Sequence, residues 1–208
     1  MVLKPETRLT WGVHIASLLP ALWLFVQWQT ANLGANPVQA ITRQTGRIAV
    51  IWLLLTLACT PASLFGWDWP RRQRRALGLY TFFYSLLHFL TFAVLDYGLQ
   101  IGIIFKTLIQ QTFILPGLAG LLILTVLALT SHKKAIQRLH RYWKPIQRTV
   151  YLAGVLILLH AAWAIKIDRR LVVVFSAIFF LLMLFRIPPV QKWLRARKPN
   201  HPSTQTDG

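Results

Sequence analysis

Three histidines lie within apolar stretches of the sequence, where an ionisable side chain is costly. They are His14, His88 and His160. An ionisable residue inside a membrane-spanning helix is a functional candidate, because a partner or ligand must compensate its removal from water. Imidazole is the commonest metal ligand among side chains, and two imidazoles on the two faces of a haem leave no open iron position. Such a pair suits electron transfer better than oxygen chemistry.

Two of these histidines, His88 and His160, allow three interpretations from their spacing. They ligate one haem, they pack helices as hydrogen-bonded interhelical histidines, or they form a proton or ion relay. Small residues near both positions would admit a flat macrocycle, and they would equally serve close helix packing. These residues are Thr81, Ser85 and Thr91 near His88, and Ala153, Gly154, Ala161 and Ala164 near His160.

The remaining histidines lie closer to polar segments. His14 is about five residues into its apolar stretch, and we interpret it as structural or as a contact for an inner-side haem, a flavin or a quinone. His132 and His140 belong to a basic segment, where solvated charge or lipid contact explains them, and His201 lies in the polar tail. The main hypothesis therefore rests on His88 and His160.

Several kinds of chemistry are missing from the sequence. Cys59 is the only cysteine, which excludes an internal disulfide, a cysteine-rich zinc site and a cysteine-ligated iron–sulfur cluster. None of the five acidic residues lies deep in an apolar stretch, so no carboxylate pair serves hydrolysis or proton-coupled transport. Dinucleotide-binding, phosphate-loop and HExxH motifs are also absent.

The elements that position these residues are apolar stretches long enough to cross a membrane. Hydrophobic residues make up 55% of the chain and charged residues 13%, whereas soluble proteins carry about 25% charged residues. A helix of about 20 apolar residues crosses a hydrocarbon core of about 30 Å. We therefore predict an all-α integral membrane protein with six transmembrane helices in one bundle. The predicted spans are residues 9–29, 48–65, 76–97, 113–130, 149–165 and 171–187.

The segments outside these spans are predicted to be tails and connections. Residues 1–8 form an N-terminal tail, residues 9–187 the membrane domain, and residues 188–208 a basic tail that begins at Pro188-Pro189 and is disordered after about Pro199. Loops are expected at 30–47, 66–75, 131–148 and 166–170, and a short interfacial helix within 98–112. The first apolar stretch is too long for a typical signal peptide, so we expect it to be retained.

The positive charge indicates how the bundle is oriented. Of the 23 Lys and Arg residues, 17 fall in the N-terminal tail, in segments 66–75 and 131–148, and from Arg186 onwards. Basic residues concentrate on cytoplasmic loops, so we predict that both termini are cytoplasmic. The basic residues lie beside apolar stretches, a position that suits contact with anionic lipid and argues against nucleic-acid binding. The spans carrying His88 and His160 then run in the same direction, with both histidines about 17–18 Å from the cytoplasmic ends.

Three groups of motifs follow one another along the chain. They are Leu33-Gly34-Ala35-Asn36-Pro37 with Thr45-Gly46-Arg47, then Arg74-Arg75-Ala76-Leu77-Gly78-Leu79 leading to Leu87-His88, and Val150-Tyr151-Leu152 followed by His160, Trp163 and Lys166. In this order and spacing the chain resembles the ferric-reductase-like transmembrane family. Within that family it is similar to the haem-binding subunits of bacterial periplasmic methionine sulfoxide reductase systems. The resemblance extends over about residues 9–186.

The resemblance implies a multi-pass electron-transfer subunit of the bacterial inner membrane rather than a complete enzyme. It implies a b-type haem on His88 and His160, with FMN as a further cofactor, and it matches His14 to a histidine of the first helix. Electrons would come from the quinone pool or from a cytoplasmic flavin reductase. They would pass to a periplasmic molybdopterin subunit that reduces methionine sulfoxide in oxidised periplasmic proteins.

The sequence departs from the family pattern at one position. Related oxidases bind two haems through histidine pairs 13 residues apart, but the residues 13 before His88 and His160 are Arg75 and Gln147. Glutamine is a poor haem ligand, so the sequence favours one haem, and Gln147 marks a candidate inner-side haem, flavin or quinone site. Because only about 20 residues follow the sixth span, we expect no flavin and nicotinamide domain, and a reductant supplied by the membrane or by a separate protein.

Two alternatives from other functional classes remain open. The chain is a ferric or quinone reductase that acts directly on a small acceptor, or it is a non-redox transporter or assembly factor. Turnover without a periplasmic partner would favour the first alternative. A colourless purified protein without haem would favour the second.

Overall fold

Every regular element that the structure describes is a helix, which confirms the predicted all-α class. The computed structural model of the chain describes residues 5–165 and 169–196, so the disorder predicted after Pro199 lies outside the described residues. The helices are α1 (Pro5–Gln29), α2 (Pro37–Leu64), α3 (Trp69–Leu90), α4 (Ile101–Gln110), α5 (Ile114–Leu129), α6 (Lys133–Leu139), α7 (Trp143–Arg148), α8 (Val150–Ala164), α9 (Arg170–Leu184) and α10 (Pro188–Ala196). A π-helix (Thr91–Asp96) continues α3, and a 3-10 turn (His140–Tyr142) separates α6 from α7.

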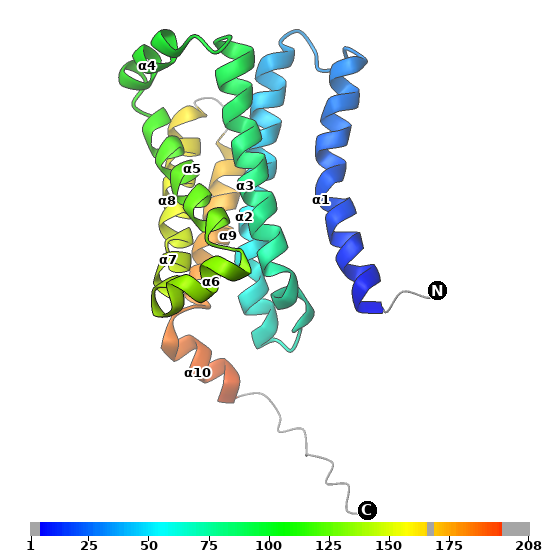
Figure 1. The fold of residues 1–208 in the computed structure, drawn as a ribbon, viewed down its shortest axis with the longest axis vertical. Coiled ribbons are helices and arrows are strands. Elements are labelled where there is room, and N and C mark those ends of the chain that lie inside the picture. The colour runs from blue at the N-terminus through cyan, green and yellow to red at the C-terminus, as the bar shows by residue number, and fades with distance from the viewer. Residues whose placement is uncertain (1–4, 166–168, 197–208) are drawn as a thin grey trace, which may run out of the picture.

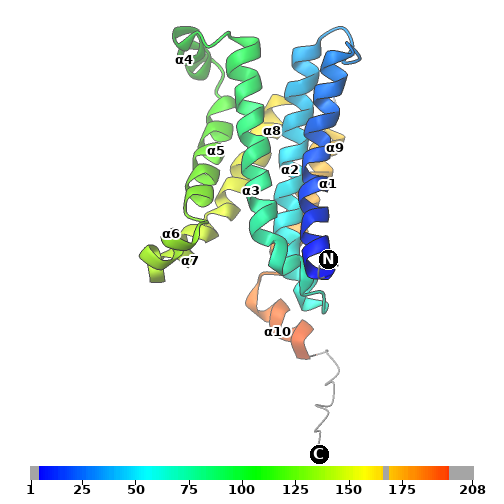
Figure 2. The ribbon, with the colours of Figure 1, turned by 45° about the vertical axis from the view of Figure 1, so that its right-hand side comes forward.

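The helices α1, α2, α3, α5, α8 and α9 run along the long axis of the molecule and alternate in direction (Figure 1). The start of α1 lies at the same end of the bundle as α6, α7 and α10, whereas α4 lies at the opposite end (Figure 2). Helix α1 therefore begins at the end of the bundle where α9 ends.

The helices are long and apolar enough for a multi-pass membrane protein. Four stretches meet the length and hydropathy of a membrane span on their own, at Thr10–Gln29, Pro37–Leu64, Trp69–Asp96 and Lys133–Ala164. Helices α4 and α5 together make a fifth, with a bend of 115° between them. The apolar helix α9 is shorter, at 15 residues. Length and composition therefore give four or five candidate spans among the described residues, and six spans stay a prediction.

Several helices begin earlier than the apolar pattern predicts. Segments 37–47, 69–75 and 131–148 are largely helical, so the prediction of loops there was wrong. Helix-starting residues account for the first of them, because the Asn36 side chain accepts a hydrogen bond of 3.0 Å from the Gln39 N–H and Pro37 takes the first position of α2. Proline also stands at the start of α10, so Pro188-Pro189 begins a further helix instead of a tail.

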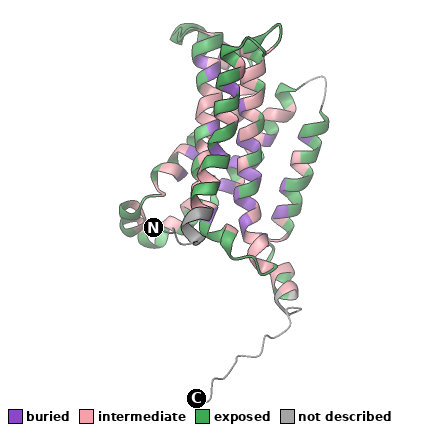
Figure 3. Ribbon diagram, turned by 90° about the vertical axis from the view of Figure 1, so that its right-hand side faces the viewer, coloured by how far each residue is buried: buried purple, intermediate pink, exposed green. Residues whose placement is uncertain are grey.

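The core lies where α2, α5, α8 and α9 meet. Its most deeply buried side chains are Leu53, Leu57, Ala153 and Phe179. Figure 3 shows the buried residues on the inward faces of the helices and exposed residues around the outside. Large apolar side chains are among the exposed ones, and Val173, for example, is 64% exposed. Lipid is the environment in which such an exposed apolar surface is stable.

Helix α1 is anchored to α3 through a tyrosine hydroxyl. The fully buried Tyr84 donates a hydrogen bond to the Ser17 carbonyl at 2.6 Å and accepts one from the Ala21 N–H at 3.2 Å. In a regular α-helix these two backbone groups bond to each other, because they are four residues apart. Pro20 lies beside them and has no N–H to contribute. The Tyr84 hydroxyl therefore bridges the helix ladder next to a proline.

Removal of this hydroxyl should loosen α1. We expect Tyr84→Phe to lower the free energy of unfolding by about 1–2 kcal/mol, because the Ser17 carbonyl loses its donor away from water. Thermal unfolding of the detergent-solubilised protein measures the change. Tyr97→Phe, which removes a hydroxyl near the far end of the same segment, serves as the control. Equal melting temperatures for the two variants would contradict this role of Tyr84.

Arg186 ties the end of α9 to two other helices. Its guanidinium donates to the Tyr151 hydroxyl of α8 at 2.6 Å and to the Leu57 carbonyl of α2 at 2.8 Å. It also lies 4.9 Å from the centre of the Tyr151 ring. The Leu57 carbonyl is available because the residue four positions later is Pro61, which has no N–H to donate. The proline thus creates the acceptor that the arginine fills.

Candidate functional site

His88 and His160 lie side by side in the half of the bundle near α4. His88 is in the last turn of α3, and His160 is in α8. Their ring centroids are 6.1 Å apart, with an angle of 69° between the ring planes. The structure thus brings together the two histidines whose equal depth the sequence predicts. The π-helix begins three residues after His88, and π-helical turns often occur at functional sites.

The His88 ring is held by the backbone of α2. Its Nδ1 lies 2.9 Å from the Thr42 carbonyl oxygen and 3.5 Å from the Thr45 hydroxyl. A carbonyl oxygen only accepts hydrogen bonds, so Nδ1 carries the proton and donates it. The Nε2 nitrogen is therefore the one with a free lone pair, which is the form of imidazole that binds a metal.

The His160 ring is held in the same way by the segment that begins α5. Its Nδ1 donates to the Phe113 carbonyl at 2.7 Å. The Phe113 ring also stacks on the imidazole, with centroids 6.0 Å apart and an angle of 29°. Here too the Nε2 lone pair remains available. Each histidine is thus oriented by a carbonyl of a helix other than its own.

The geometry of the two rings fits a metal between them. Bonds from a metal to imidazole nitrogen are about 2.0–2.1 Å long, so two nitrogens on opposite sides of a metal are about 4 Å apart and their ring centres about 6 Å apart. The observed 6.1 Å between His88 and His160 matches this separation. Among the described residues, no group of three or more His, Cys, Asp or Glu could hold a metal ion. A haem is compatible with this pair, because its macrocycle needs only two axial ligands from the protein.

The small residues predicted near the histidines mostly pack helices. A side chain at Gly154 would overlap the Phe179 ring of α9. Ala153 is fully buried in the core. The Thr81 hydroxyl faces the Thr56 hydroxyl of α2, at 3.4 Å. Thr91 is the exception, because its hydroxyl donates to the His88 carbonyl at 2.7 Å and so lies beside the helical turn that carries His88.

His14 belongs to a separate aromatic cluster between α1, α2 and α3. Its Nδ1 lies 2.9 Å from the Tyr80 hydroxyl. The Trp11 ring lies 6.4 Å from the His14 ring, and the Trp52 ring 6.0 Å from the Tyr80 ring. Tyr80 precedes His88 by eight residues on α3, which is about 12 Å along the helix. His14 is therefore not a third member of the His88–His160 site.

Gln147, the other candidate for an inner-side site, contacts the end of α5. Its amide donates to the Leu127 carbonyl at 3.3 Å and to the Thr130 hydroxyl at 3.1 Å. These groups lie at the C-terminal end of α5, where helix carbonyls lack partners within their own helix. Gln147 thus caps a helix, and its hydrogen bonds do not join it to His14. His132 likewise bonds the Leu129 carbonyl, at 2.7 Å from an exposed position.

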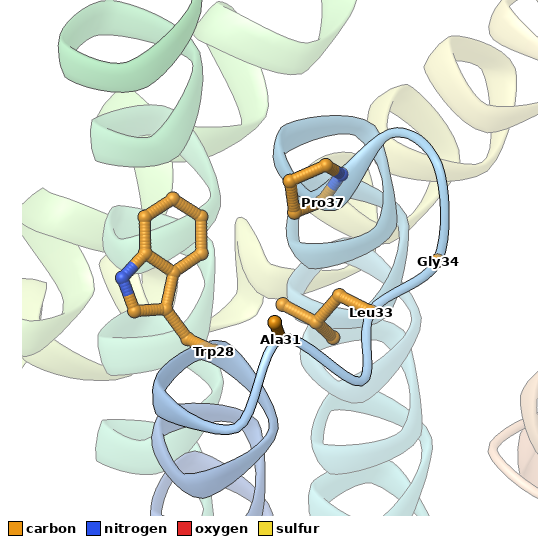
Figure 4. Close-up of a pocket in the computed structure, with 5 residues that line it drawn as sticks. All are labelled: Trp28, Ala31, Leu33, Gly34 and Pro37. Carbon is orange, nitrogen blue, oxygen red and sulfur yellow. The ribbon is translucent and has the colours of Figure 1, made fainter.

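A small apolar pocket lies beside the connection between α1 and α2. It has a volume of about 170 Å³ and is lined by Trp28, Ala31, Leu33, Gly34 and Pro37 (Figure 4). Three of these residues belong to the Leu33–Pro37 motif region. The pocket lies at the end of the bundle opposite α10 (Figure 1), which is also the end nearer to His88.

The residues that sequence reasoning missed are those that hold the rings. Thr42 and Phe113 act through their backbone carbonyls, which no residue type reveals. Gly46 and Gly117 lie against the imidazoles. Gly46 was visible only as part of the Thr45-Gly46-Arg47 motif.

The chain is similar to membrane proteins of known families. A family model described as "Ferric reductase like transmembrane component" matches residues 45–158, a range that contains His88 and ends two residues before His160. The chain is 40% identical over 203 residues to the "Protein-methionine-sulfoxide reductase heme-binding subunit MsrQ" of Rhodospirillum rubrum, covering 96% of this chain and 98% of that protein. Proteins of the same name from Brucella ovis and Brucella suis are 36% identical over 196 residues, covering 94% of this chain and 88% of theirs.

Proposed function

The chain belongs to the ferric reductase like transmembrane family and, within it, to the MsrQ heme-binding subunits, and on this premise we propose that it carries electrons across the bacterial inner membrane through one haem b. His88 and His160 are the proposed axial ligands. The proposal includes six membrane spans with both termini in the cytoplasm. The alternating helices and the concentration of basic residues at one end support this orientation.

One observation carries the proposal: two facing imidazoles whose Nδ1 atoms are both committed to backbone carbonyls. The bonds to Thr42 and Phe113 measure 2.9 and 2.7 Å. They select the tautomer with a free Nε2 on each ring and stop the rings from turning. A bound haem supplies reversible one-electron chemistry at its iron. Both side chains are half-buried in the bundle, against α2 and the start of α5.

We propose that electrons enter where α1 meets α3. His14 and Tyr80 offer an imidazole and a hydroxyl within 2.9 Å of each other, and such groups can bind a quinol oxygen and accept its proton. Trp11 is 59% exposed beside them, on a surface that faces lipid. The quinone pool is the donor in this proposal. A cytoplasmic flavin reductase, and FMN as a carrier, are suggested by the family alone.

We propose that electrons leave at the opposite end, to a periplasmic molybdenum-cofactor methionine sulfoxide reductase. The relatives are named as subunits of a methionine sulfoxide reductase, which supports a partner of this kind. The proposed exit surface combines residues 32–47, beside the pocket of Figure 4, with segment 166–170, of which residues 166–168 lie outside the described part of the chain.

Spectroscopy of the purified protein tests the proposal. We expect the reduced-minus-oxidised bands of a low-spin b-type haem, with one haem per chain by pyridine haemochrome assay. In liposomes, we expect quinol oxidation to drive methionine sulfoxide reduction only when the periplasmic catalytic subunit is added. A colourless protein would refute the haem role. Reduction of ferric salts or quinones at full rate without a partner would instead identify a stand-alone reductase.

The entry site has its own test. We expect His14→Ala to slow quinol oxidation about 100-fold, the scale of a lost proton acceptor, while the haem content stays unchanged. The rate is measured by stopped-flow reduction of the haem with a soluble quinol. His132→Ala, which alters an exposed histidine outside the spans, is the control. Equal rates in the two variants would contradict an entry site at His14.

A further inference from the structure

The two histidines are held by two copies of one arrangement. His88 of α3 bonds the Thr42 carbonyl of the segment that forms α2, and His160 of α8 bonds the Phe113 carbonyl at the start of α5. In each case a glycine follows four residues after the carbonyl along the chain, within α2 or within α5. These glycines are Gly46 and Gly117. Each lies directly against the imidazole that the carbonyl holds.

The contact distances leave no room for a side chain at Gly117 unless the imidazole shifts, and little room at Gly46. A Cβ atom at Gly117 would lie 2.8 Å from Nδ1 and 2.9 Å from Cγ of His160. A Cβ atom at Gly46 would lie 3.2 Å from both Cε1 and Nδ1 of His88. Carbon atoms in contact are normally about 3.5–4.0 Å apart. The His160 imidazole would therefore have to shift and the His88 imidazole would have to give by a few tenths of an ångström. Either displacement would disturb the hydrogen bond to the carbonyl that orients the ring.

There is a geometrical reason why a glycine stands four residues after each carbonyl that holds an imidazole. Residues four apart lie on the same face of a helix, so the ring that reaches the carbonyl of residue i must pass over residue i+4. The carbonyl has two lone pairs, and it can accept from the imidazole in addition to the helix N–H. The ring reaches hydrogen-bonding distance only if residue i+4 has no side chain on that face.

We propose that Gly46 and Gly117 are positioning residues that set the orientation of the two haem ligands. The inference rests on the proposed function, and it adds that the absence of a side chain at these positions determines how the imidazoles bind. Partners that orient metal ligands typically change metal affinity about 10–100-fold when they are lost. The two glycines act in this way without touching the metal.

The test compares two substitutions on one helix pair. We expect Gly117→Ala to weaken haem retention about 10–100-fold, to shift the midpoint potential and to add a high-spin component to the spectrum. Gly120→Ala is the matched control, because its Cβ would meet Ile157 Cγ1 of the same helix α8 at 2.9 Å without touching a histidine. Size-exclusion profiles and melting temperatures report the packing cost that both variants share.

The outcomes separate this inference from the proposed function. Spectral and potential changes confined to Gly117→Ala support the inference, as does a smaller change of the same kind in Gly46→Ala, where the contact is 3.2 Å. Gly46→Ala also gives the answer if Gly117→Ala fails to fold. Equal spectra in Gly117→Ala, Gly46→Ala and Gly120→Ala would overturn the inference and leave the haem role intact. A wild-type protein without haem would overturn the proposed function itself.

Discussion

His160→Ala is expected to leave the purified protein without haem absorption bands while its helices still assemble. The imidazole supplies one of the two axial bonds that the site offers, and its ring lies 6.1 Å from the ring of His88, which supplies the other. Among the described residues, no group of three or more His, Cys, Asp or Glu could hold a metal ion in its place. We expect His88→Ala to behave in the same way, because the His88 imidazole supplies the other axial bond. The haem-to-protein ratio and the optical spectrum measure the loss.

Controls separate loss of a ligand from loss of fold. Gln147→Ala should keep full haem content, because the Gln147 amide bonds the Leu127 carbonyl and the Thr130 hydroxyl at the end of α5. In His160→Gly, added imidazole should restore part of the low-spin spectrum, since it can occupy the space of the missing ring. Normal haem content in His88→Ala or in His160→Ala would eliminate that residue as a ligand.

Arg186→Ala is expected to lower the free energy of unfolding by about 3 kcal/mol. A hydrogen bond to a charged group contributes about 1.5–3 kcal/mol, and Arg186 makes one to the Tyr151 hydroxyl and one to the Leu57 carbonyl. Without the guanidinium, the Leu57 carbonyl would have no donor, because Pro61 cannot bond it. Thermal and denaturant unfolding in detergent micelles measure the change.

Three further variants test the geometry of this contact. Arg186→Lys should recover only part of the stability, since an ammonium group cannot reproduce the two-armed contact. Tyr151→Phe keeps the ring and removes one hydrogen bond, so its loss should be smaller than that of Arg186→Ala. Lys192→Ala removes an exposed basic residue nearby and should have little effect. A melting temperature for Arg186→Ala equal to that of Lys192→Ala would disprove this stabilising role of Arg186.

The depth of a residue in a span could be predicted from the sequence. A helix rises by a constant amount per residue, so the positions of His88 and His160 in two parallel spans placed them at one level before any packing was known. Their rings are indeed neighbours. The orientation inferred from the excess of basic residues at one end stays a prediction, because only charge and order along the chain enter that argument.

Contacts across helices could not be predicted in this way. Small size at Gly154 suggested room for a macrocycle, yet the Phe179 ring of α9 fills that space. The sequence did not single out Gly117, yet this glycine lies against the His160 ring. Which of two glycines faces a ligand depends on how α8 packs between α5 and α9. One sequence without its packing partners does not contain that information.

The predicted helix boundaries were wrong for a different reason. The apolar pattern marks where a helix is in hydrocarbon, and polar residues at its ends extend it into the interface. Asn36 and Pro37 start α2 well before the apolar stretch begins, through a side-chain cap and a fixed φ angle. Capping signals were present in the sequence, and they outweigh hydropathy wherever the chain leaves the membrane core.

The two carbonyls that hold the imidazoles also bear on the speed of the reaction. When a metal centre gains or loses an electron, the atoms around it readjust, and the energy of that readjustment slows the transfer. Here the Thr42 and Phe113 carbonyls belong to the backbone and fix the rings at 2.9 and 2.7 Å. The ligands can turn only if a neighbouring helix moves. A preorganised polar environment of this kind needs little reorganisation, so the two carbonyls would keep the reorganisation energy of the proposed redox centre low.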